Sequence, residues 1–183
     1  MKNKPRLQVK YETEIVPAMM EKFSLKNSFQ VPKIKKVSIN MGIGKGAQEK
    51  KFIDDALSEL SLIAGQKPFA TRAKKAISNF KIREGSTVGC AVTLRKAYMY
   101  EFLDRLINVA LPRIKDFRGV SIKSFDQAGN YSLGLKEHTI FPELNLDRIS
   151  DVKGMTVTIT ITKTTQEVSR EFMKMLGMPF EKR

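Results

Sequence analysis

The alternation of apolar and polar residues at positions 155–163, the cleanest in the chain, is the feature that most constrains its fold. Successive side chains of an extended strand point to opposite faces, so this segment predicts a strand with one apolar and one threonine-rich face. Its apolar members are Met155, Val157, Ile159 and Ile161. Segments 34–41 and 87–95 alternate in the same way. Strands of this kind predict a sheet that is buried on one face and polar on the other.

Helical periodicity predicts a cover for the apolar face of this sheet. Apolar residues spaced three and four apart predict helices at 11–23, 49–64, 97–111 and 164–176. Pro17 predicts that the first of these is imperfect or starts late. Thr164 and Glu167 match a capping box at the start of the last helix, and Gly177 is expected to end it.

Shorter segments complete the predicted elements. Residues 66–72 predict a strand at an edge of the sheet, because Pro68 cannot donate a hydrogen bond to a neighbouring strand. Residues 73–86 are polar and basic and predict a loop. Residues 120–125 and 131–135 predict a pair of strands joined by the turn at 127–130.

The net charge narrows the function. Lys and Arg together number 33 and Asp and Glu 19, so the formal charge is +14. A domain this basic repels itself, and nucleic acid is the commonest polyanion that compensates such a charge. A charge needed only for solubility rarely exceeds ~8 in a small domain. We expect a nucleic-acid partner, with an anionic membrane surface as the alternative.

The fold class follows from the elements and the charge together. Helices and strands are interspersed without regular alternation, which is typical of α+β proteins. We expect a mixed, largely antiparallel sheet with helices packed on one face and the other face open for RNA. The length of 183 residues predicts a single domain over 1–183. Its N-terminal segment would be 1–86, with a basic loop at 72–86, and its C-terminal segment 87–183.

Composition excludes several classes of protein. One cysteine and one histidine exclude a disulfide framework and a zinc site made of Cys and His alone. No apolar run approaches the ~18 residues of a membrane span. The first ten residues are charged and lack the apolar stretch of a signal peptide. We therefore expect a soluble cytoplasmic protein that has no membrane partner.

The polar face of the predicted sheet is a candidate RNA platform. It would present Ser38, Asn40, Gln66 and Thr93, with Lys36, Arg72 and Arg95 near its margins. Small residues at Gly89 and Ala91 would let the backbone of a partner come close. An ordinary solvated sheet face explains the same pattern equally well.

The basic loop carries five cations and an aromatic residue in a stretch too polar to be core. They are Arg72, Lys74, Lys75, Lys81 and Arg83, with Asn79 and Phe80 between them. Lys and Arg neutralise phosphates, and an exposed Phe can stack on a base, so RNA contact is favoured. The alternative is a solvated loop with Phe80 or Ile82 tucked inward. A second basic and aromatic turn, at 112–119, has mixed charge and suits a protein contact equally well.

Enzyme-like features of the chain are weak. The turn from Gly42 to Ala47 can be written G-x-G-x-x-A, so a small nucleotide-binding enzyme is the alternative function. Such a site needs an acidic residue at the end of a second strand, whereas Glu59 falls within a predicted helix. Cys90 is expected in the core and His138 on the surface. We predict no enzyme, no cofactor and no bound metal.

Many separated motifs resemble one family over nearly the whole chain, namely bacterial ribosomal large-subunit protein five. This is the 5S rRNA-binding family of the central protuberance. The motifs lie in order at 30–33, 40–44, 64–68, 79–83, 89–95, 112–119, 124–126, 129–132 and 140–143.

The resemblance implies a structural role in the large subunit. It implies 5S rRNA on the open sheet face, P-site tRNA at the basic loop, and small-subunit ribosomal protein thirteen in an intersubunit bridge, besides neighbouring large-subunit rRNA and proteins. The family's RNA-binding positions fall on Asn40, Gln66 and Thr93, to which we add Lys36, Ser38 and Arg95. The expected residues of the protein contact are Arg113, Lys115, Asp116, Arg118, His138 and Phe141.

Overall fold

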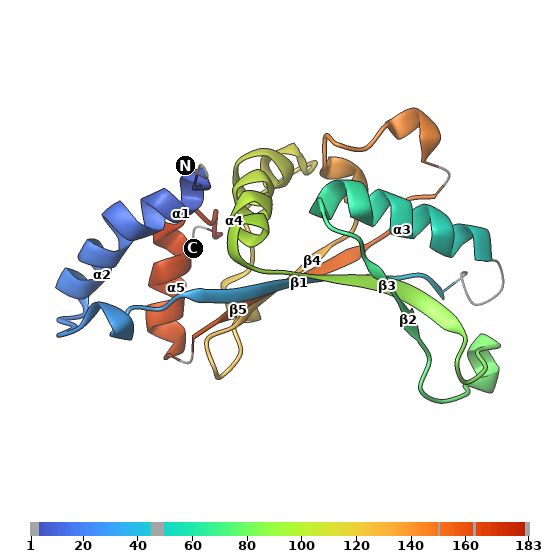
Figure 1. The fold of residues 1–183 in the computed structure, drawn as a ribbon, viewed down its shortest axis with the longest axis horizontal. Coiled ribbons are helices and arrows are strands. Elements are labelled where there is room, and N and C mark those ends of the chain that lie inside the picture. The colour runs from blue at the N-terminus through green and yellow to red at the C-terminus, as the bar shows by residue number, and fades with distance from the viewer. Residues whose placement is uncertain (1–3, 45–49, 150, 163, 182–183) are drawn as a thin grey trace. The chain divides into compact units, whose positions relative to one another are not determined.

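The computed structural model describes residues 4–44, 50–149, 151–162 and 164–181. Within these residues, five strands form one sheet in the order β2-β3-β1-β5-β4 (Figure 1). The interspersed helices and strands confirm the predicted α+β class. Residues 45–47 of the glycine turn, Glu49 at the start of a predicted helix and Lys163 at the end of a predicted strand lie outside the described residues. The strands are β1 (Ile34–Gly42), β2 (Phe69–Arg72), β3 (Thr87–Leu94), β4 (Tyr131–Leu135) and β5 (Met155–Ile161).

The chain divides into two compact units. The first comprises Met1–Val37, Arg95–Leu133 and Thr158–Arg183, and the second comprises Ser38–Leu94 and Gly134–Val157. The boundaries fall inside β1, β4 and β5, so each of these strands contributes residues to both units.

Burial along the strands follows the predicted alternation. In β1, Val37, Ile39 and Met41 are fully buried, whereas Asn40 is exposed. All four apolar residues of β5 are buried. Cys90 of β3 is buried as well, which confirms the prediction that it is a core residue. Because the apolar residues of a strand share one face, the helices need to cover that face only.

Helix α3 (Lys50–Ala64) covers the apolar side of the second unit. Ile53, Leu60 and Ile63 form its buried stripe, and it lies over β2 and β3 on one side of the strands (Figure 1). Gly65 follows with a φ of +65°, a conformation in which glycine ends a helix at little cost. β2 pairs antiparallel with β3 and begins at Phe69, three residues later than predicted. Its place at the end of the strand order confirms the predicted edge strand.

A π-helical turn precedes a proline at two places in the first unit. α1 (Arg6–Lys10) continues through a π turn at Tyr11–Ile15 into α2 (Val16–Lys22), which contains Pro17. Proline has no N–H and its ring clashes with the carbonyl four residues earlier, so a wider turn makes room for it. The helix is therefore imperfect, as predicted, but it does not start late. α4 (Lys96–Arg105) reaches Pro112 through the π turn Leu106–Ala110 in the same way.

The last helix, α5 (Gln166–Met175), has a different cap from the predicted one. Its N-cap is Thr165, whose Oγ1 accepts the N–H of Val168 at 3.5 Å. The prediction of a capping box at Thr164 and Glu167 is wrong, because residue 165 has the extended backbone of the cap. Gly177, with a φ of +102°, ends the helix as predicted.

The predicted hairpin around residues 127–130 is half correct. Residues 131–135 form β4, and Asp126 holds the turn by accepting the N–H groups of Ala128 and Asn130 at 2.9 and 2.8 Å. Residues 120–125 do not form a strand. Val120 instead pairs with the chain's C-terminal segment, since its N–H donates to Pro179 and its carbonyl accepts from Glu181.

None of the helices in the described residues has the length and apolar character needed to cross a membrane.

Candidate nucleic-acid interface

Four of the predicted RNA-binding residues lie in the second unit, and three of them lie on its polar strand face. Asn40 is exposed on β1, and Ser38 and Thr93 are half-buried on β1 and β3. Gln66 lies in the connection between α3 and β2, not in a strand as predicted, and its side chain is tied to β3. Gln66 Nε2 donates a hydrogen bond to the Thr93 carbonyl at 3.2 Å. This bond leaves the Gln66 carbonyl oxygen and a second N–H for a partner.

The two charged members of the predicted RNA-binding set lie in the first unit. Arg95 follows β3 and is exposed, and its Nη1 lies 3.5 Å from the carbonyl oxygen of Lys35. Lys36 is half-buried on β1. Gln66 therefore contacts Thr93 within the second unit. Arg95 contacts the backbone of β1 within the first unit.

Gly89 lets the neighbouring strand β1 come close to β3. The residue is buried, and a Cβ at this position would lie 2.5 Å from the carbonyl oxygen of Met41 and 3.1 Å from Thr71 Oγ1. The prediction that Gly89 leaves room for a partner's backbone is therefore wrong, because β1 already fills that space. Ala91 is half-buried on the same strand.

The basic loop, residues 72–86, forms a hydrogen-bonded extension of β2 and β3. At its base, the N–H of Ala73 donates to Ser86 at 2.8 Å, and that of Gly85 donates to Ala73 at 2.9 Å. Near its tip, Ile77 and Ile82 exchange two backbone hydrogen bonds. Between the end of β2 at Arg72 and the start of β3 at Thr87, the chain forms no α-helix and no further strand of the sheet, which agrees with the predicted loop.

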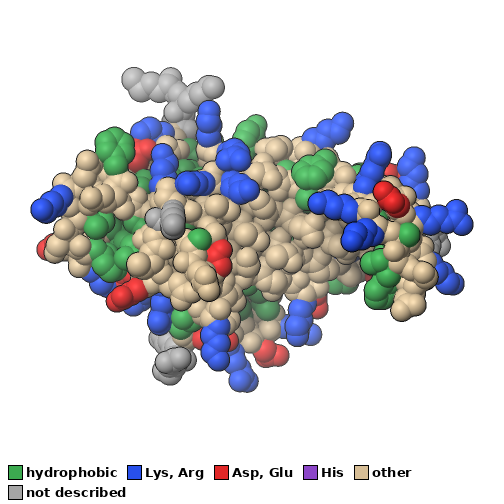
Figure 2. Space-filling model, turned by 90° about the horizontal axis from the view of Figure 1, so that it is seen from below, with side chains coloured by type: hydrophobic (Ala, Val, Ile, Leu, Met, Phe, Trp, Pro, Cys, Tyr) green, Lys and Arg blue, Asp and Glu red, His purple; other side chains and the backbone are tan. Residues whose placement is uncertain are grey.

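Most side chains of the basic loop are exposed. All five of its Lys and Arg residues are exposed, together with Asn79. Phe80 is 68% exposed, so the alternative in which it tucks inward is wrong, whereas Ile82 is half-buried. Figure 2 shows Lys and Arg side chains gathered at the end of the second unit that carries this loop.

The turn at 112–119 also keeps its charges outside. Arg113, Lys115, Asp116 and Arg118 are exposed, while Phe117 is half-buried. These four charged residues of the predicted protein contact are therefore available to a partner.

His138 and Phe141 are the two predicted contact residues that the structure places in the interior. His138 has no exposed surface and Phe141 is 1% exposed. The prediction of a surface histidine is wrong because His138 meets Glu59 of α3 and Lys153 below the surface. Neither side chain can itself touch a partner, so only their neighbours in the chain can do so.

Glu59, His138 and Lys153 form a buried ionic cluster within the second unit. Lys153 Nζ lies 2.9 and 2.7 Å from the two carboxylate oxygens of Glu59. His138 Nδ1 accepts the backbone N–H of Lys153 at 3.1 Å, which assigns the ring proton to Nε2. That nitrogen lies 3.1 Å from Glu59 Oε2.

Burial and the charges of the cluster shift the pKa values of Glu59 and of Cys90. Burial alone would raise the pKa of Glu59, but the nearby His138 ring and the hydrogen-bonded Lys153 ammonium outweigh it and hold the pKa below its ordinary value. Burial, with the Glu59 charge nearby, raises the pKa of Cys90 to about 11. A thiol with so high a pKa stays protonated at neutral pH and is no nucleophile.

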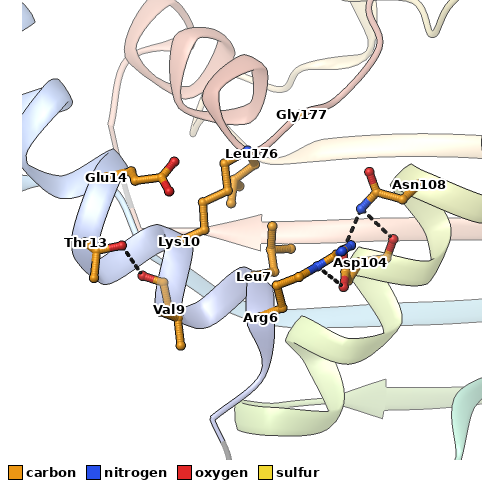
Figure 3. Close-up of a pocket in the computed structure, with 10 residues that line it drawn as sticks. All are labelled: Arg6, Leu7, Val9, Lys10, Thr13, Glu14, Asp104, Asn108, Leu176 and Gly177. Carbon is orange, nitrogen blue, oxygen red and sulfur yellow. Dashed lines mark hydrogen bonds and ion pairs between the residues drawn. The ribbon is translucent and has the colours of Figure 1, made fainter.

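Figure 3 shows a pocket of about 580 Å³ in the first unit, on the side of α1 that faces α4. Arg6 crosses its wall and forms an ion pair with Asp104, whose Oδ1 also accepts from Asn108. The lining includes Lys10 and Glu14 as well, so its formal charges cancel. A charge-balanced wall selects neither a phosphate nor a metal ion, and nothing in it forms a catalytic unit.

The glycine turn has no features of a nucleotide site in its described part. A Cβ at Gly42 or Gly44 would meet no atom within 4 Å. Glu59, the acidic residue considered for such a site, lies in the middle of α3 and is held by Lys153 and His138.

Comparisons with known proteins identify the family. Residues 27–83 match the family model of ribosomal protein L5, and residues 87–180 match that of the ribosomal L5P family C-terminus. The large ribosomal subunit protein uL5 of Clostridium tetani (strain Massachusetts / E88) is 56% identical over 176 residues, which cover 96% of this chain and 98% of the relative. The uL5 proteins of Clostridium botulinum (strain Eklund 17B / Type B) and Clostridium perfringens (strain SM101 / Type A) are each 57% identical over 175 residues, with the same coverage.

The chain belongs to the ribosomal protein L5 family.

Membership of the L5 family confirms the predicted resemblance and the broad function. The chain is a structural protein of the large ribosomal subunit, is not an enzyme, and is located in the cytoplasm. Its partners are rRNA and other ribosomal proteins. The nucleotide-binding enzyme considered from the glycine turn is thereby excluded.

The ionic cluster was not predicted from the sequence. One signal was present, since Glu59 directly precedes Leu60 of the buried helix stripe and so borders the apolar face of α3. The partners could not be found in this way, because His138 and Lys153 lie 79 and 94 positions further along the chain.

Proposed function

We propose that this L5 protein binds 5S rRNA through the polar strand face and the residues at its margin. The residues are Lys36, Ser38, Asn40, Gln66, Thr93 and Arg95. The observation that carries the proposal lies in the second unit, where α3 covers one side of β2 and β3 and the polar side adjoins a loop with five exposed cations. Uncharged polar groups on rigid strands suit the fixed edges and 2′-hydroxyl groups of a structured RNA.

A second part of the proposal assigns the basic loop to P-site tRNA. Its exposed residues are Arg72, Lys74, Lys75, Asn79, Phe80, Lys81 and Arg83. The cations supply phosphate contacts, and Phe80 supplies a face for stacking on a base. Replacing Lys81 and Arg83 by alanine should weaken tRNA binding to the ribosomal P site while 5S rRNA binding by the free protein is largely kept.

The third part assigns an intersubunit contact to small-subunit ribosomal protein thirteen. The exposed charges at Arg113, Lys115, Asp116 and Arg118 form one candidate patch. The other is the acidic loop, residues 137–153, which contains four carboxylates. Its basic residues are Arg148 and the buried Lys153, and without Lys153 its formal charge is −3.

The chemistry of the acidic loop favours a protein partner over RNA. A negative segment repels phosphate, so within a chain of charge +14 it is the part least suited to RNA. Leu146 and Val152 are 63% and 55% exposed in this loop and offer apolar contact area.

Binding of purified 5S rRNA at several salt concentrations tests the RNA contact. Asn40→Ala or Thr93→Ala should cost ~1–3 kcal/mol at every salt concentration, because an unpaired polar group is left in the interface. Arg95→Ala should instead reduce the salt dependence by about 0.7–0.9 units of slope, since one phosphate contact is lost. Wild-type affinity in both Asn40→Ala and Thr93→Ala would rule out the strand face as the binding surface.

We also propose that residues 1–183 fold as a single domain. Three strands pass from one compact unit into the other, so separating the units would break each of these strands. Urea unfolding followed by circular dichroism and by fluorescence of the four tyrosines should give coincident single transitions. Two resolved transitions would show that the units unfold separately.

A further inference from the structure

The acidic loop connects β4 to β5, which are neighbours in the sheet, and one pair of residues closes it just beyond these strands. The His138 N–H donates to the Lys153 carbonyl at 3.0 Å, and the Lys153 N–H donates to His138 Nδ1 at 3.1 Å. These two bonds join the ends of a loop whose described residues, 139–149 and 151–152, form 3₁₀ turns and irregular backbone. A compact loop with its ends in contact is typical of segments that carry function.

Glu59, a residue of helix α3, connects this closed base to the helix. Its carboxylate receives both contacts from Lys153 Nζ and lies 3.1 Å from His138 Nε2. Glu59 is 8% exposed, Lys153 6% and His138 not at all. An unpaired charge on Glu59 or Lys153 would therefore be costly, so each of these two ions depends on the other.

The cluster is better suited to defining a conformation than to adding stability. A buried ion pair loses much of its Coulomb energy to desolvation, and apolar residues of similar size often stabilise a fold as well. Apolar residues pack in several ways, whereas the two hydrogen bonds from Lys153 Nζ to the Glu59 carboxylate are satisfied in one arrangement. Buried Ile140, Phe141 and Leu144 anchor the loop as well, but they do not specify hydrogen-bond geometry.

We propose that Glu59 is a positioning residue that locks the acidic loop in one conformation on α3. The lock acts through Lys153 and His138, and it presents Leu146 and Val152 to a partner in a fixed arrangement. That last consequence rests on the protein contact proposed above, whereas the lock itself can be measured in the free protein.

Hydrogen exchange of the full-length protein tests the lock directly. In Glu59→Gln, the amides of His138 and Lys153 should exchange at least about tenfold faster, because the Lys153 ammonium loses its counter-charge. The Ile43 amide, which donates to Val88 in the sheet of the same unit, should change much less. Equal acceleration at all three amides would mean general destabilisation of the unit and would overturn the proposal, as would unchanged exchange at His138 and Lys153.

A double variant separates positioning from stability. Glu59→Gln with Lys153→Met leaves no unpaired charge, so resistance to urea should return toward that of wild type. The His138 and residue 153 amides should still exchange faster than in wild type, since both hydrogen bonds from Lys153 Nζ are gone. Full recovery of their protection would overturn the proposal. Asp54→Asn, an exposed carboxylate on the same helix, is the matched control and should change none of these rates.

Binding of purified small-subunit ribosomal protein thirteen then tests the consequence. Glu59→Gln and the double variant should bind it more weakly than Asp54→Asn does. Faster loop exchange with unchanged binding would support the role of Glu59 in the lock, but it would refute the protein contact through this loop.

Discussion

The basic loop and the acidic loop leave the same unit with opposite charge and different anchors. Residues 72–86 carry five cations against Glu84, whereas residues 137–153 carry a surplus of carboxylates. The basic loop is closed by backbone hydrogen bonds, and its Phe80 is exposed. The acidic loop is closed by a backbone hydrogen bond and by a bond from the Lys153 N–H to the His138 ring, and its Phe141 is buried. An exposed phenylalanine on a positive loop suits RNA, and a buried one fixes a loop for protein contact.

Truncation of the two phenylalanines should give the largest contrast. Phe141→Ala removes a ring that is 1% exposed and should cost about 3–5 kcal/mol in the free energy of unfolding. Phe80→Ala removes a ring that lies mostly in solvent and should cost less than about 0.5 kcal/mol. Urea denaturation of both variants measures the contrast. Similar losses would show that the two loops are anchored alike.

The root of the basic loop should be sensitive at Gly89. This residue pairs with Thr71 in the β2–β3 ladder, and an added methyl group would meet the Met41 carbonyl. Gly89→Ala should therefore destabilise the protein by about 1–3 kcal/mol through overpacking. Gly42→Ala is the matched control, because a Cβ there meets no atom within 4 Å, and it should stay within about 0.5 kcal/mol of wild type. Equal effects at both glycines would contradict the close approach of β1.

The anchor of the acidic loop should be sensitive to acid. The pKa of Glu59 is lower in the folded protein than its ordinary value of 4.5, so the folded state releases this proton more readily. The stabilisation is fully present above the ordinary pKa and is lost as the pH falls through the lowered one. The difference in stability between wild type and Glu59→Gln should be largest at neutral pH and vanish in strong acid. A difference that stayed constant from pH 7 to pH 2 would contradict this linkage.

The two loops also differ in how far the sequence could predict them. The basic loop was predicted with its limits and its exposed cations, because a run of Lys and Arg around residue 75 is local information. The strands β1, β3 and β5 were predicted for the same reason, since period-two alternation is local as well.

The acidic loop could not be predicted from such local patterns. His138 stands between Glu137 and Thr139 in a polar stretch, and its burial depends on a carboxylate from a distant helix. Val120 was expected to belong to a strand paired with β4, but its backbone forms hydrogen bonds with the C-terminal segment. Gly89 was predicted to leave room for the backbone of a binding partner, but the neighbouring strand β1 fills that space. In all three cases the deciding contact is long-range.

The smallest effects on stability, and the sharpest separation of roles, should come from single exposed charges. Lys74 and Asp147 are both exposed, one in each loop, and substitution of either should leave the free energy of unfolding within about 0.5 kcal/mol of wild type. Lys74→Ala should reduce the salt dependence of tRNA binding to the ribosomal P site by about 0.7–0.9 units of slope if its ammonium neutralises one phosphate. Asp147→Asn removes a negative charge from the loop that we propose for protein contact, so it should leave that slope unchanged. It should weaken binding of small-subunit protein thirteen instead, and most strongly at low salt, where exposed charges are least screened. An unchanged slope in Lys74→Ala together with a changed slope in Asp147→Asn would reverse the assignment of RNA and protein to the two loops.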